Sequence, residues 1–495
     1  MQPPLSRCLL LAVVVVATGC YEKTGPVLSP PLTLPLPDAV APVPSAAQVA
    51  WQTQELSAFL HFGMNTFTNK EQGDGTDSPT LFNPTAFDAR QWITALRGGG
   101  FKEALLTAKH HDGFCLWPTT CTTYSVAASP FQGGNGDVVR EFVDAAHEGN
   151  VRVALALSPL DRHDPSYGTP AYLSVFECQL RELLTNYGSV DEIWLWQGPA
   201  TPAFDWTAIR DLVHQLQPQT LVELANIAPM APSEVRSIGQ SSPGTGATPT
   251  DQSSVQSPDG SVGTSYIPAE AVYSIRPGWF WHAAEDSQVK TADQLLGIYF
   301  DSVGRNSLLR LDVPPDTRGL LADPDVAALN QLGTAIAVLY RTNVAAGRPA
   351  SVDSVFEDLP AYAASSAVDG TTDTFWAAAA GQTSARLEID LEGTPMFDLI
   401  SLQEPIALGE RTTEYHVEAR ANGTWTTIAA GTFIGERKLY QISPVTADRV
   451  ALVITAARGA PAISELGLYD SGQAQGTSAS LAGERAAIET TLQQD

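Results

Sequence analysis

Short apolar runs alternate with amphipathic segments along the first two thirds of the chain. Apolar runs of about four to eight residues are typical of buried strands, and an apolar period near 3.6 residues is typical of helices that face a core. The pattern predicts strands at residues 59–64, 104–108, 151–157, 192–196 and 221–224, and helices at 89–97, 138–148, 172–187 and 206–216. Because strands that alternate with helices pair in parallel, residues 48–344 are predicted to form a (β/α)8-like TIM barrel of the α/β class.

The last third of the chain changes to short alternating runs at residues 385–391, 415–419 and 449–454. Regularly spaced strands with turns between them predict a β-sandwich over residues 345–470. Within it, Trp376 is expected in the core. Trp425 follows Asn422-Gly423 and is expected in a hairpin. Residues 471–495 are expected to form a polar tail.

The N-terminus has the organisation of an export signal, with Arg7, an apolar run over residues 9–16 and small residues before Cys20. The run is too short to span a bilayer. Cys20 stands at the expected cleavage point, as in a bacterial lipobox. We therefore expect residues 1–20 to be a lipoprotein-type signal peptide, with a lipid anchor on Cys20 that holds the exported protein at a bacterial membrane or cell surface. A plain secretion signal is the alternative and implies a periplasmic or secreted protein. The Pro-rich residues 21–47 predict a semi-stiff linker.

The composition restricts the partners that the folded body could bind. The chain has 495 residues, which fits two or three domains, and its 28 basic and 54 acidic residues give a formal charge of -26. Such an acidic protein is repelled by nucleic acid and by anionic lipid surfaces. A neutral glycan is a compatible partner, and membrane contact is expected only through the lipid anchor.

Five cysteines are too few for a disulfide scaffold. Cys8 and Cys20 belong to the predicted signal, so Cys115, Cys121 and Cys178 remain in the body. Exported chains can form disulfides, and Cys115 with Cys121 is the closest pair in the sequence, so we expect that bond. No Cys-x-x-Cys or His-rich tract indicates zinc.

Polar side chains gather where the predicted strands end. His61 lies near the end of the first strand, His110 and His111 follow the second, residues 161–163 follow the third and Gln197 follows the fourth. A TIM barrel builds its site at these carboxyl ends, and hydrogen-bonding groups beside aromatic faces suit a sugar. A metal site from the three histidines is the alternative, although adjacent residues on an extended strand point to opposite faces. No Gly-x-Gly-x-x-Gly follows a strand, so a dinucleotide site lacks its fingerprint.

Five motifs occur in order within roughly residues 48–340. They are His-Phe-Gly-Met-Asn-Thr-Phe at 61–67, His-His-Asp-Gly-Phe at 110–114, Gly-Asp-Val-Val at 136–139, Leu-Ser-Pro at 157–159 and Arg-Pro-Gly-Trp at 276–279. Together they resemble glycoside hydrolase family 29, the α-L-fucosidases. The resemblance implies a retaining exo-enzyme on a (β/α)8-like barrel that binds terminal L-fucose of glycans and needs no cofactor. It implies sugar contacts from His61, Glu71, His110, His111, Trp117, Arg276 and Trp279.

The two catalytic carboxylates of such an enzyme are missing where the resemblance places them. A retaining glycosidase needs a nucleophile and an acid/base about 5 to 5.5 Å apart. The family's fourth strand reads much like Glu-Ile-Trp-Phe-Asp-Gly, whereas residues 192–198 of this chain read Glu-Ile-Trp-Leu-Trp-Gln-Gly. Trp196 or Gln197 therefore stands where the nucleophilic aspartate belongs, and Ser241 stands at the acid/base position. Neither glutamine nor serine carries the required negative charge.

Four other carboxylates are candidates for substitutes: Asp191, Asp205, Glu223 and Glu270. Asp191 precedes its strand, Asp205 is placed to cap a helix, and Glu223 lies in an apolar strand where burial would raise its pKa. Glu270 fits a family motif near the site and is the candidate surrogate acid. The first hypothesis is therefore an exported fucosidase-like hydrolase with unrecognised carboxylates. The alternative is a catalytically inactive, glycan-binding pseudoenzyme. A structural surface protein with a closed pocket is the third.

The C-terminal region carries its own motifs, which are Ala-Val-Asp-Gly at 367–370, Asp-Thr-Phe-Trp at 373–376 and Ile-Ser-Glu-Leu-Gly-Leu-Tyr at 463–469. They resemble a discoidin-like jelly roll, the coagulation factor 5/8 type C domain. The resemblance implies glycan binding through loop aromatics and a structural calcium ion, for which Asp373 and Glu465 are the candidate ligands. A packing module that supports the barrel is the alternative.

Overall fold

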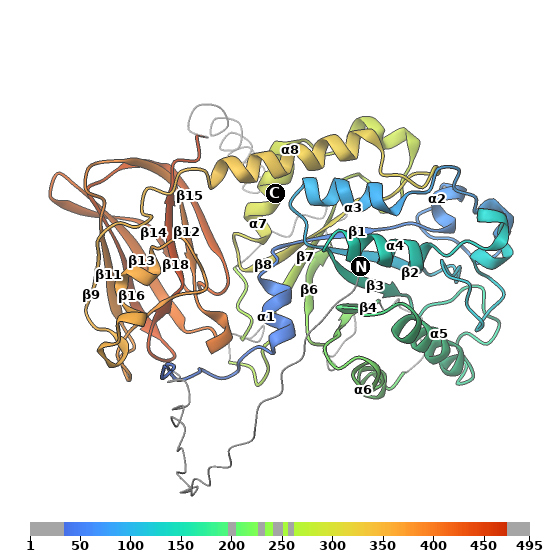
Figure 1. The fold of residues 1–495 in the computed structure, drawn as a ribbon, viewed down its shortest axis with the longest axis horizontal. Coiled ribbons are helices and arrows are strands. Elements are labelled where there is room, and N and C mark those ends of the chain that lie inside the picture. Colours follow the sequence, from blue (N-terminus) through green and yellow to red (C-terminus); the bar gives the residue numbers. More distant parts are fainter. Residues whose placement is uncertain (1–33, 197–203, 226–232, 241–250, 256–261, 473–495) are drawn as a thin grey trace, which may run out of the picture. The chain divides into compact units, whose positions relative to one another are not determined.

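The computed structural model describes residues 34–196, 204–225, 233–240, 251–255 and 262–472. Its first region is built on eight parallel strands (Figure 1). They are β1 (Leu56–Leu60), β2 (Glu103–Lys109), β3 (Arg152–Leu157), β4 (Glu192–Trp196), β5 (Leu221–Ala225), β6 (Arg236–Gln240), β7 (Ala269–Ser274) and β8 (Ser307–Asp312). The strand order is β5-β4-β3-β2-β1-β8-β7-β6, and a parallel bridge between Glu223 and Val235 brings the two ends together. The predicted TIM-like barrel is confirmed.

Helices connect these strands as the periodicity predicts. They are α1 (Ala46–Gln52), α2 (Met64–Thr68), α3 (Ala89–Gly98), α4 (Val138–Glu148), α5 (Tyr172–Asn186), α6 (Trp206–Leu216), α7 (Ala292–Ser302) and α8 (Asp323–Leu339). Aspartates begin three of them, because a carboxylate satisfies amide groups that have no partner in the first turn. Asp88, Asp137 and Asp205 accept hydrogen bonds from the first turns of α3, α4 and α6. Asp205 is therefore a helix cap, as its position in the sequence indicated.

The sequence pattern places β1 too far along the chain. The apolar run predicts a strand at residues 59–64, whereas β1 ends at Leu60 and α2 begins at Met64. The strand ends early because Thr107 binds the chain just beyond it. The Thr107 hydroxyl accepts a hydrogen bond from the Phe62 amide and lies 2.8 Å from the Phe62 carbonyl oxygen. These contacts turn the chain away from the sheet. His61 is thereby placed just beyond the strand end.

The side chains inside the barrel form layers, because every second residue of a strand points inward. At the amino ends of the strands lies an apolar cluster of Trp51, Leu221, Val235 and Leu308. Two residues further along the strands lies a charged layer, which we call the ionic layer. It consists of Ser57, Glu103, Glu192, Glu223, Ser237, Glu270 and Arg310. Above it lies a second apolar cluster of Phe59, Leu105, Ala154, Ala156, Trp194 and Val272, on which the site at the carboxyl ends rests.

The C-terminal region is antiparallel throughout. Its strands are β9 (Ala350–Val352), β10 (Trp376–Ala377), β11 (Ala385–Asp390), β12 (Met396–Gln403), β13 (Thr412–Ala421), β14 (Thr424–Gly431), β15 (Lys438–Thr446), β16 (Arg449–Ala457), β17 (Ala462–Ile463) and β18 (Glu465–Tyr469). A five-stranded sheet, β14-β13-β16-β11-β9, and a three-stranded sheet, β15-β12-β18, supply side chains to one apolar core. Trp376 is fully buried in that core, and Trp425 follows a β13–β14 hairpin turn with positive φ at Asn422 and Gly423. The predicted β-sandwich is confirmed.

The end of the predicted linker is bound to the sandwich. The Val40 amide donates to the Leu408 carbonyl, and the Arg411 guanidinium donates to the Asp38 carbonyl. Residues 38–40 are therefore part of the folded body rather than a free spacer. Helix α1 then begins at a Ser45–Gln48 capping box. The described residues include no helix with the length and hydrophobicity that a bilayer crossing requires.

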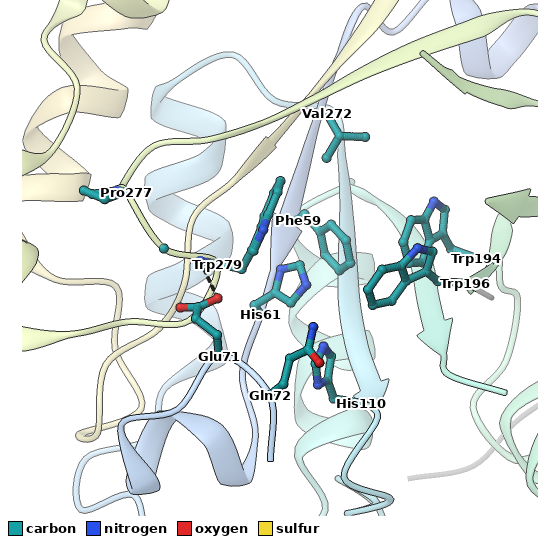
Figure 2. Close-up of a pocket in the computed structure, with 11 residues that line it drawn as sticks. Phe59, His61, Glu71, Gln72, His110, Trp194, Trp196, Val272, Pro277 and Trp279 are labelled. Carbon is teal, nitrogen blue, oxygen red and sulfur yellow. Dashed lines mark hydrogen bonds between the residues drawn. The ribbon is translucent and has the colours of Figure 1, made fainter. Parts of the chain in front are cut away.

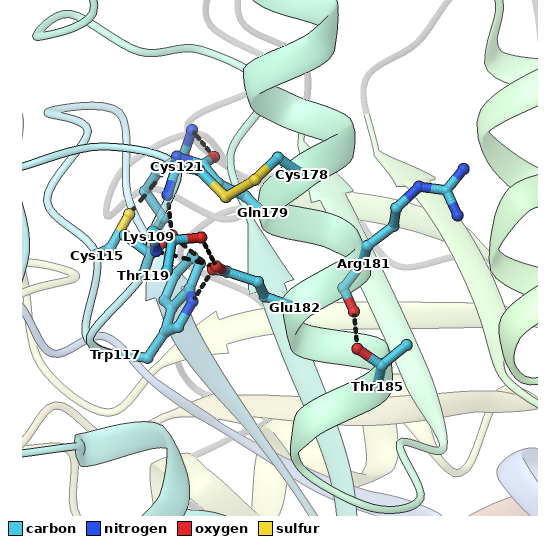
Figure 3. The surroundings of a disulfide bond; sticks show 11 residues. Lys109, Cys115, Trp117, Thr119, Cys121, Cys178, Gln179, Arg181, Glu182 and Thr185 are labelled. Carbon is cyan, nitrogen blue, oxygen red and sulfur yellow. Dashed lines mark hydrogen bonds between the residues drawn. A yellow bond between two sulfur atoms is a disulfide. The ribbon is translucent and has the colours of Figure 1, made fainter.

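The structure pairs different cysteines from those expected. Cys121 forms a disulfide with Cys178 of α5, and Cys115 is a buried free thiol (Figure 3). The expected Cys115–Cys121 bond is wrong, because Cys115 returns to the sheet, where its amide donates to the Tyr124 carbonyl and its thiol lies beside Gln179. Proximity in the sequence did not indicate proximity in space.

We predict that the disulfide stabilises the barrel measurably. It closes a span of 57 residues, for which the entropy of the unfolded chain gives about 4 kcal/mol as an upper value. Urea denaturation should show a lower midpoint for Cys178→Ser and for the reduced wild-type protein. Reductant should leave the midpoint of Cys178→Ser unchanged. Equal midpoints for the oxidised and reduced wild-type protein would contradict the prediction.

Candidate active site at the barrel mouth

A pocket of about 410 Å³ opens at the carboxyl ends of the barrel strands (Figure 2). Its lining residues come from several strands and from the loops that follow them. They are Phe59, His61, Glu71, Gln72, His110, Trp194, Trp196, Val272, Pro277, Gly278 and Trp279. The volume falls in the range of small-molecule sites. Imidazoles and indoles predominate, and Glu71 is the one carboxylate among these lining residues.

His61 is held by a buried carboxylate at the end of β8. Its Nδ1 lies 2.7 Å from an oxygen of Asp312, which is fully buried. Burial raises the pKa of Asp312 to about 6, and the neighbouring imidazole opposes that rise. The Asp312 contact fixes the orientation of the ring and leaves Nε2 for a ligand. Asp312 carries no signal in the sequence beyond its place at a strand end.

His110 and His111 lie side by side, with ring centroids 4.2 Å apart. The expectation that they point to opposite faces is wrong, because β2 ends at Lys109 and both residues belong to the turn beyond it. His111 Nδ1 lies 2.6 Å from the Ser158 hydroxyl, and Asn65 contacts Nδ1 of His110. No group of metal-ligating side chains among the described residues includes any of the three histidines.

Both of these imidazoles are neutral at ordinary pH. Burial lowers the pKa of His111 to about 3, with the Arg162 charge as the next cause. Burial and the neighbouring histidines hold the pKa of His110 well below its ordinary value. A neutral imidazole has one donor and one acceptor, which is the pairing that a sugar hydroxyl needs. The Nε2 atom of His111 has no hydrogen-bond partner among the described residues.

Two indoles from β4 form one side of the pocket. Glu192, Trp194 and Trp196 alternate inward, so Trp196 stands at the strand end, where its ring packs on His111 at a centroid distance of 4.1 Å. Figure 2 shows Trp194 and Trp196 together on the side of the pocket opposite Trp279. The strand position at which a nucleophile was expected thus delivers an aromatic ring.

Glu71 anchors the loop that carries Trp279. One of its oxygens accepts from the Trp279 amide at 3.0 Å, and the other accepts from the Phe280 amide and lies 2.7 Å from His282 (Figure 2). Gly278 permits this approach, because a Cβ there would lie 2.5 Å from the carboxylate. Glu71 therefore lines the pocket with its carboxylate already engaged by the loop.

Three residues of the predicted sugar site are placed elsewhere. Trp117 is buried and donates from its indole to Glu182 (Figure 3). Arg276 is fully buried and pairs with Asp325 and Asp286 rather than lining the pocket. Glu270 lies in the ionic layer, where Arg310 Nε contacts it, so it cannot act as a surrogate acid at the barrel mouth.

The remaining candidates have structural roles or cannot be placed. Asp191 accepts from the Val153 amide at the amino ends of the strands, and Glu223 lies in the ionic layer. Gln197 and Ser241 lie outside the described residues. Four pocket-lining residues were not predicted from the strand ends: Phe59, Trp194, Val272 and Gln72. The inward alternation of side chains along β1, β4 and β7 would have indicated the first three.

Among the described residues, the structure brings no set of calcium ligands together around Asp373 or Glu465. Glu465 accepts from the Gly370 amide and from Asn343, and Asp373 is exposed. Among the residues that the structure describes, no group of three ligating side chains includes either carboxylate. Calcium binding stays a prediction.

A TIM barrel whose mouth is lined by histidines and indoles, followed by a discoidin-like sandwich, is an arrangement that fits the glycoside hydrolase class. Residues 42–338 match the family model for alpha-L-fucosidase, and residues 351–466 match that for the F5/8 type C domain. The chain therefore belongs to the α-L-fucosidase family.

Its relatives extend the likeness over nearly the whole chain. "Putative alpha-L-fucosidase 1" of Oryza sativa subsp. japonica is 42% identical over 471 residues, which are 91% of this chain and 88% of the relative. Alpha-L-fucosidase 1 of Arabidopsis thaliana is 37% identical over 88% of this chain and 89% of its own length. The structure of a Ruminococcus gnavus GH29 fucosidase in complex with fucose has a TM-score of 0.79 at 31% identity, and the match covers 88% of this chain and 97% of that one.

We predict that the barrel loses stability on the acid side through His111. An unfolded histidine binds a proton below about pH 6.5, whereas folded His111 does so only near pH 3. The folding equilibrium constant therefore decreases as the pH falls below about 6.5. The decrease is at most tenfold per pH unit.

Urea midpoints measured at pH 7, 6 and 5 test this prediction. The slope with pH should be shallower in His111→Gln than in the wild-type protein. A His416→Gln change in the sandwich strand β13 serves as the matched control and should keep the wild-type slope. An unchanged slope in His111→Gln would refute the assignment.

Proposed function

We propose that the barrel-mouth pocket binds terminal L-fucose of glycans and does not hydrolyse the fucosidic bond. The chain would then act as a glycan-binding member of the α-L-fucosidase family. His61, His110 and His111 supply hydrogen-bonding groups for the sugar hydroxyls, and Trp196 and Trp279 supply apolar faces for its C–H groups.

The proposal rests on the small number of carboxylates at the pocket. Double displacement needs two carboxylates about 5 to 5.5 Å apart at the sugar. The lining residues include only Glu71, whose oxygens are engaged by the Trp279 loop. Segments 197–203, 226–232 and 241–250, which follow β4, β5 and β6, contain no Asp or Glu in their sequence. Segment 256–261 contains a single acid, Asp259. This shortage supports recognition without cleavage.

The end of β4 also lacks charge stabilisation for the transition state. An oxocarbenium-like transition state is positive, and a retaining enzyme places a negative group beside it. Trp196 offers an indole at the strand end instead, and its Nε1 has no partner among the described residues. An indole cannot form a glycosyl ester or accept a proton, so the ground-state sugar is the species that this pocket fits.

We predict that the purified protein binds L-fucose in a calorimetric titration and releases no nitrophenol from 4-nitrophenyl α-L-fucoside. Trp279→Ala should weaken fucose binding at least tenfold, because the sugar loses a stacking face. Trp425→Ala, in the sandwich hairpin, is the matched control and should leave the affinity of the barrel pocket unchanged. D-glucose serves as the control sugar in the titration, because the pocket is not expected to recognise it.

Turnover by the unmodified chain would contradict this proposal. If turnover occurs and Asp259→Asn abolishes it while fucose still binds, Asp259 is the missing carboxylate and the protein is a hydrolase. If neither binding nor turnover is found, the pocket is closed to fucose and the structural hypothesis replaces both.

We propose further that the protein is exported and lipid-anchored through Cys20. The apolar run before Cys20 and the Cys121–Cys178 disulfide support this, since disulfides persist in oxidising compartments. In a bacterial host, the full chain should fractionate with membranes. Cys20→Ser should move it to the soluble exported or unprocessed fraction. Wild-type protein recovered wholly in the cytoplasm would refute the proposal.

A further inference from the structure

The ionic layer in the barrel core contains more carboxyl groups than cations. Glu103, Glu192, Glu223 and Glu270 are all fully buried, and Arg310 is the fully buried cation among them. Arg152 reaches Glu103 from the edge of the layer at 3.5 Å. Unpaired carboxylates are costly when fully buried, so a reduction of the excess negative charge within the layer is favourable.

Three of the four glutamates have hydrogen-bond donors. Arg310 donates to Glu192 at 2.7 Å and to Glu270, and its Nη1 lies 3.5 Å from Glu103. Trp51 donates to Glu192.

Serine hydroxyls complete these contacts. Ser57 donates to Glu103 and Ser237 donates to Glu270, both at 2.9 Å. Each of Glu103, Glu192 and Glu270 therefore has at least one donor. Burial nevertheless raises the pKa of Glu192 to about 8, against the opposing charge of Arg310.

Glu223 differs from the other three. Neither of its carboxyl oxygens has a partner at hydrogen-bond distance among the described residues, although the side chain is fully buried. The Ser237 hydroxyl lies near enough to oppose the rise of its pKa, but it donates to Glu270. Oxygen atoms of Glu192, Glu223 and Glu270 lie within 4.8 Å of one another. A carboxylate next to two others is unfavourable, but a carboxylic acid has an O–H that either neighbour can accept.

We propose that Glu223 binds a proton in the folded protein and shares it with Glu192 or Glu270. The proton is taken from solvent as the barrel folds, no covalent bond between residues is made, and the layer loses one negative charge. Arg310 then faces the carboxylates of Glu192 and Glu270 across β4, β7 and β8, and the proton on Glu223 makes it a donor from β5 to one of them. Burial, together with the charges of Glu270 and Glu192, holds the pKa of Glu223 well above its ordinary value, and Arg310 only partly opposes this.

The consequence is a barrel that weakens as the pH rises. An unfolded glutamate releases its proton above about pH 4.3, whereas folded Glu223 keeps it. A group with a raised folded-state pKa stabilises the protein at low pH, and that stabilisation is lost as the pH rises towards the folded-state value. Linkage limits the loss to tenfold in the folding equilibrium constant per pH unit for one proton.

Urea unfolding of the full chain between pH 5 and pH 8 tests the proposal. Tryptophan fluorescence reports mainly on the barrel, because eight of the ten tryptophans lie within residues 48–344. Glu223→Gln keeps a donor and removes the titration, so it should match the wild-type protein at pH 5 and exceed its stability increasingly towards pH 8. Glu414→Gln makes the same change at an exposed position and should follow the wild-type curve.

Infrared spectroscopy gives a second readout that does not depend on unfolding. Burial also raises the pKa of other carboxyl groups, to about 8 for Glu192 and to about 7 for Asp112 and Glu404, so the spectra of variants are compared by difference. Wild-type protein at pH 7 should show the carbonyl band of protonated carboxylic acids, and the band should lose one carboxyl group's intensity in Glu223→Gln and Glu223→Leu. Absence of the band in the wild-type protein would overturn the proposal, even if a variant failed to fold. A wild-type stability that rises with CaCl2 or MgCl2 and falls with EDTA would overturn it in favour of a buried cation. Equal pH slopes for wild type and Glu223→Gln would also overturn it.

Discussion

The contacts of Arg310 with Glu192 and Glu270 hold the middle of the barrel together. They join β8 to its neighbour β7 and, across the interior of the barrel, to β4. Removing either side of such a buried pair leaves an uncompensated charge, which typically costs about 3–5 kcal/mol. The apolar cluster of Phe59 and Trp194 lies directly above these contacts, so the floor of the pocket depends on the geometry of the ionic layer.

The site above this floor is organised by residues that the sugar would not touch. Asp312 orients His61, Ser158 orients His111, and Glu71 holds the loop of Trp279. These contacts engage polar groups that could otherwise act as acids or bases, and the histidine and tryptophan rings face the cavity. A pocket built in this way is suited to recognising hydroxyl groups and poorly suited to stabilising a developing positive charge.

Two further contacts fix the loop after β2, which begins with the two histidines. The Cys121–Cys178 disulfide ties it to α5. Glu182, also in α5, accepts hydrogen bonds from Trp117, Thr119 and Thr120 (Figure 3). Trp117 therefore supports the site from outside it, where the family resemblance implied a direct sugar contact.

The sequence alone determined the architecture, because hydrophobic periodicity depends on local spacing and each barrel strand and helix repeats it. It also identified His61 and His110, which line the pocket, because strand ends of a parallel barrel converge, and the family resemblance added Trp279. Only the tertiary structure decided that Cys121 pairs with Cys178, that Arg276 binds Asp325, and that Glu223 and Glu270 face Arg310. These partners are separated by tens of residues or more and come from different elements. Their meeting is set by strand register and side-chain alternation in three dimensions, which no local pattern encodes.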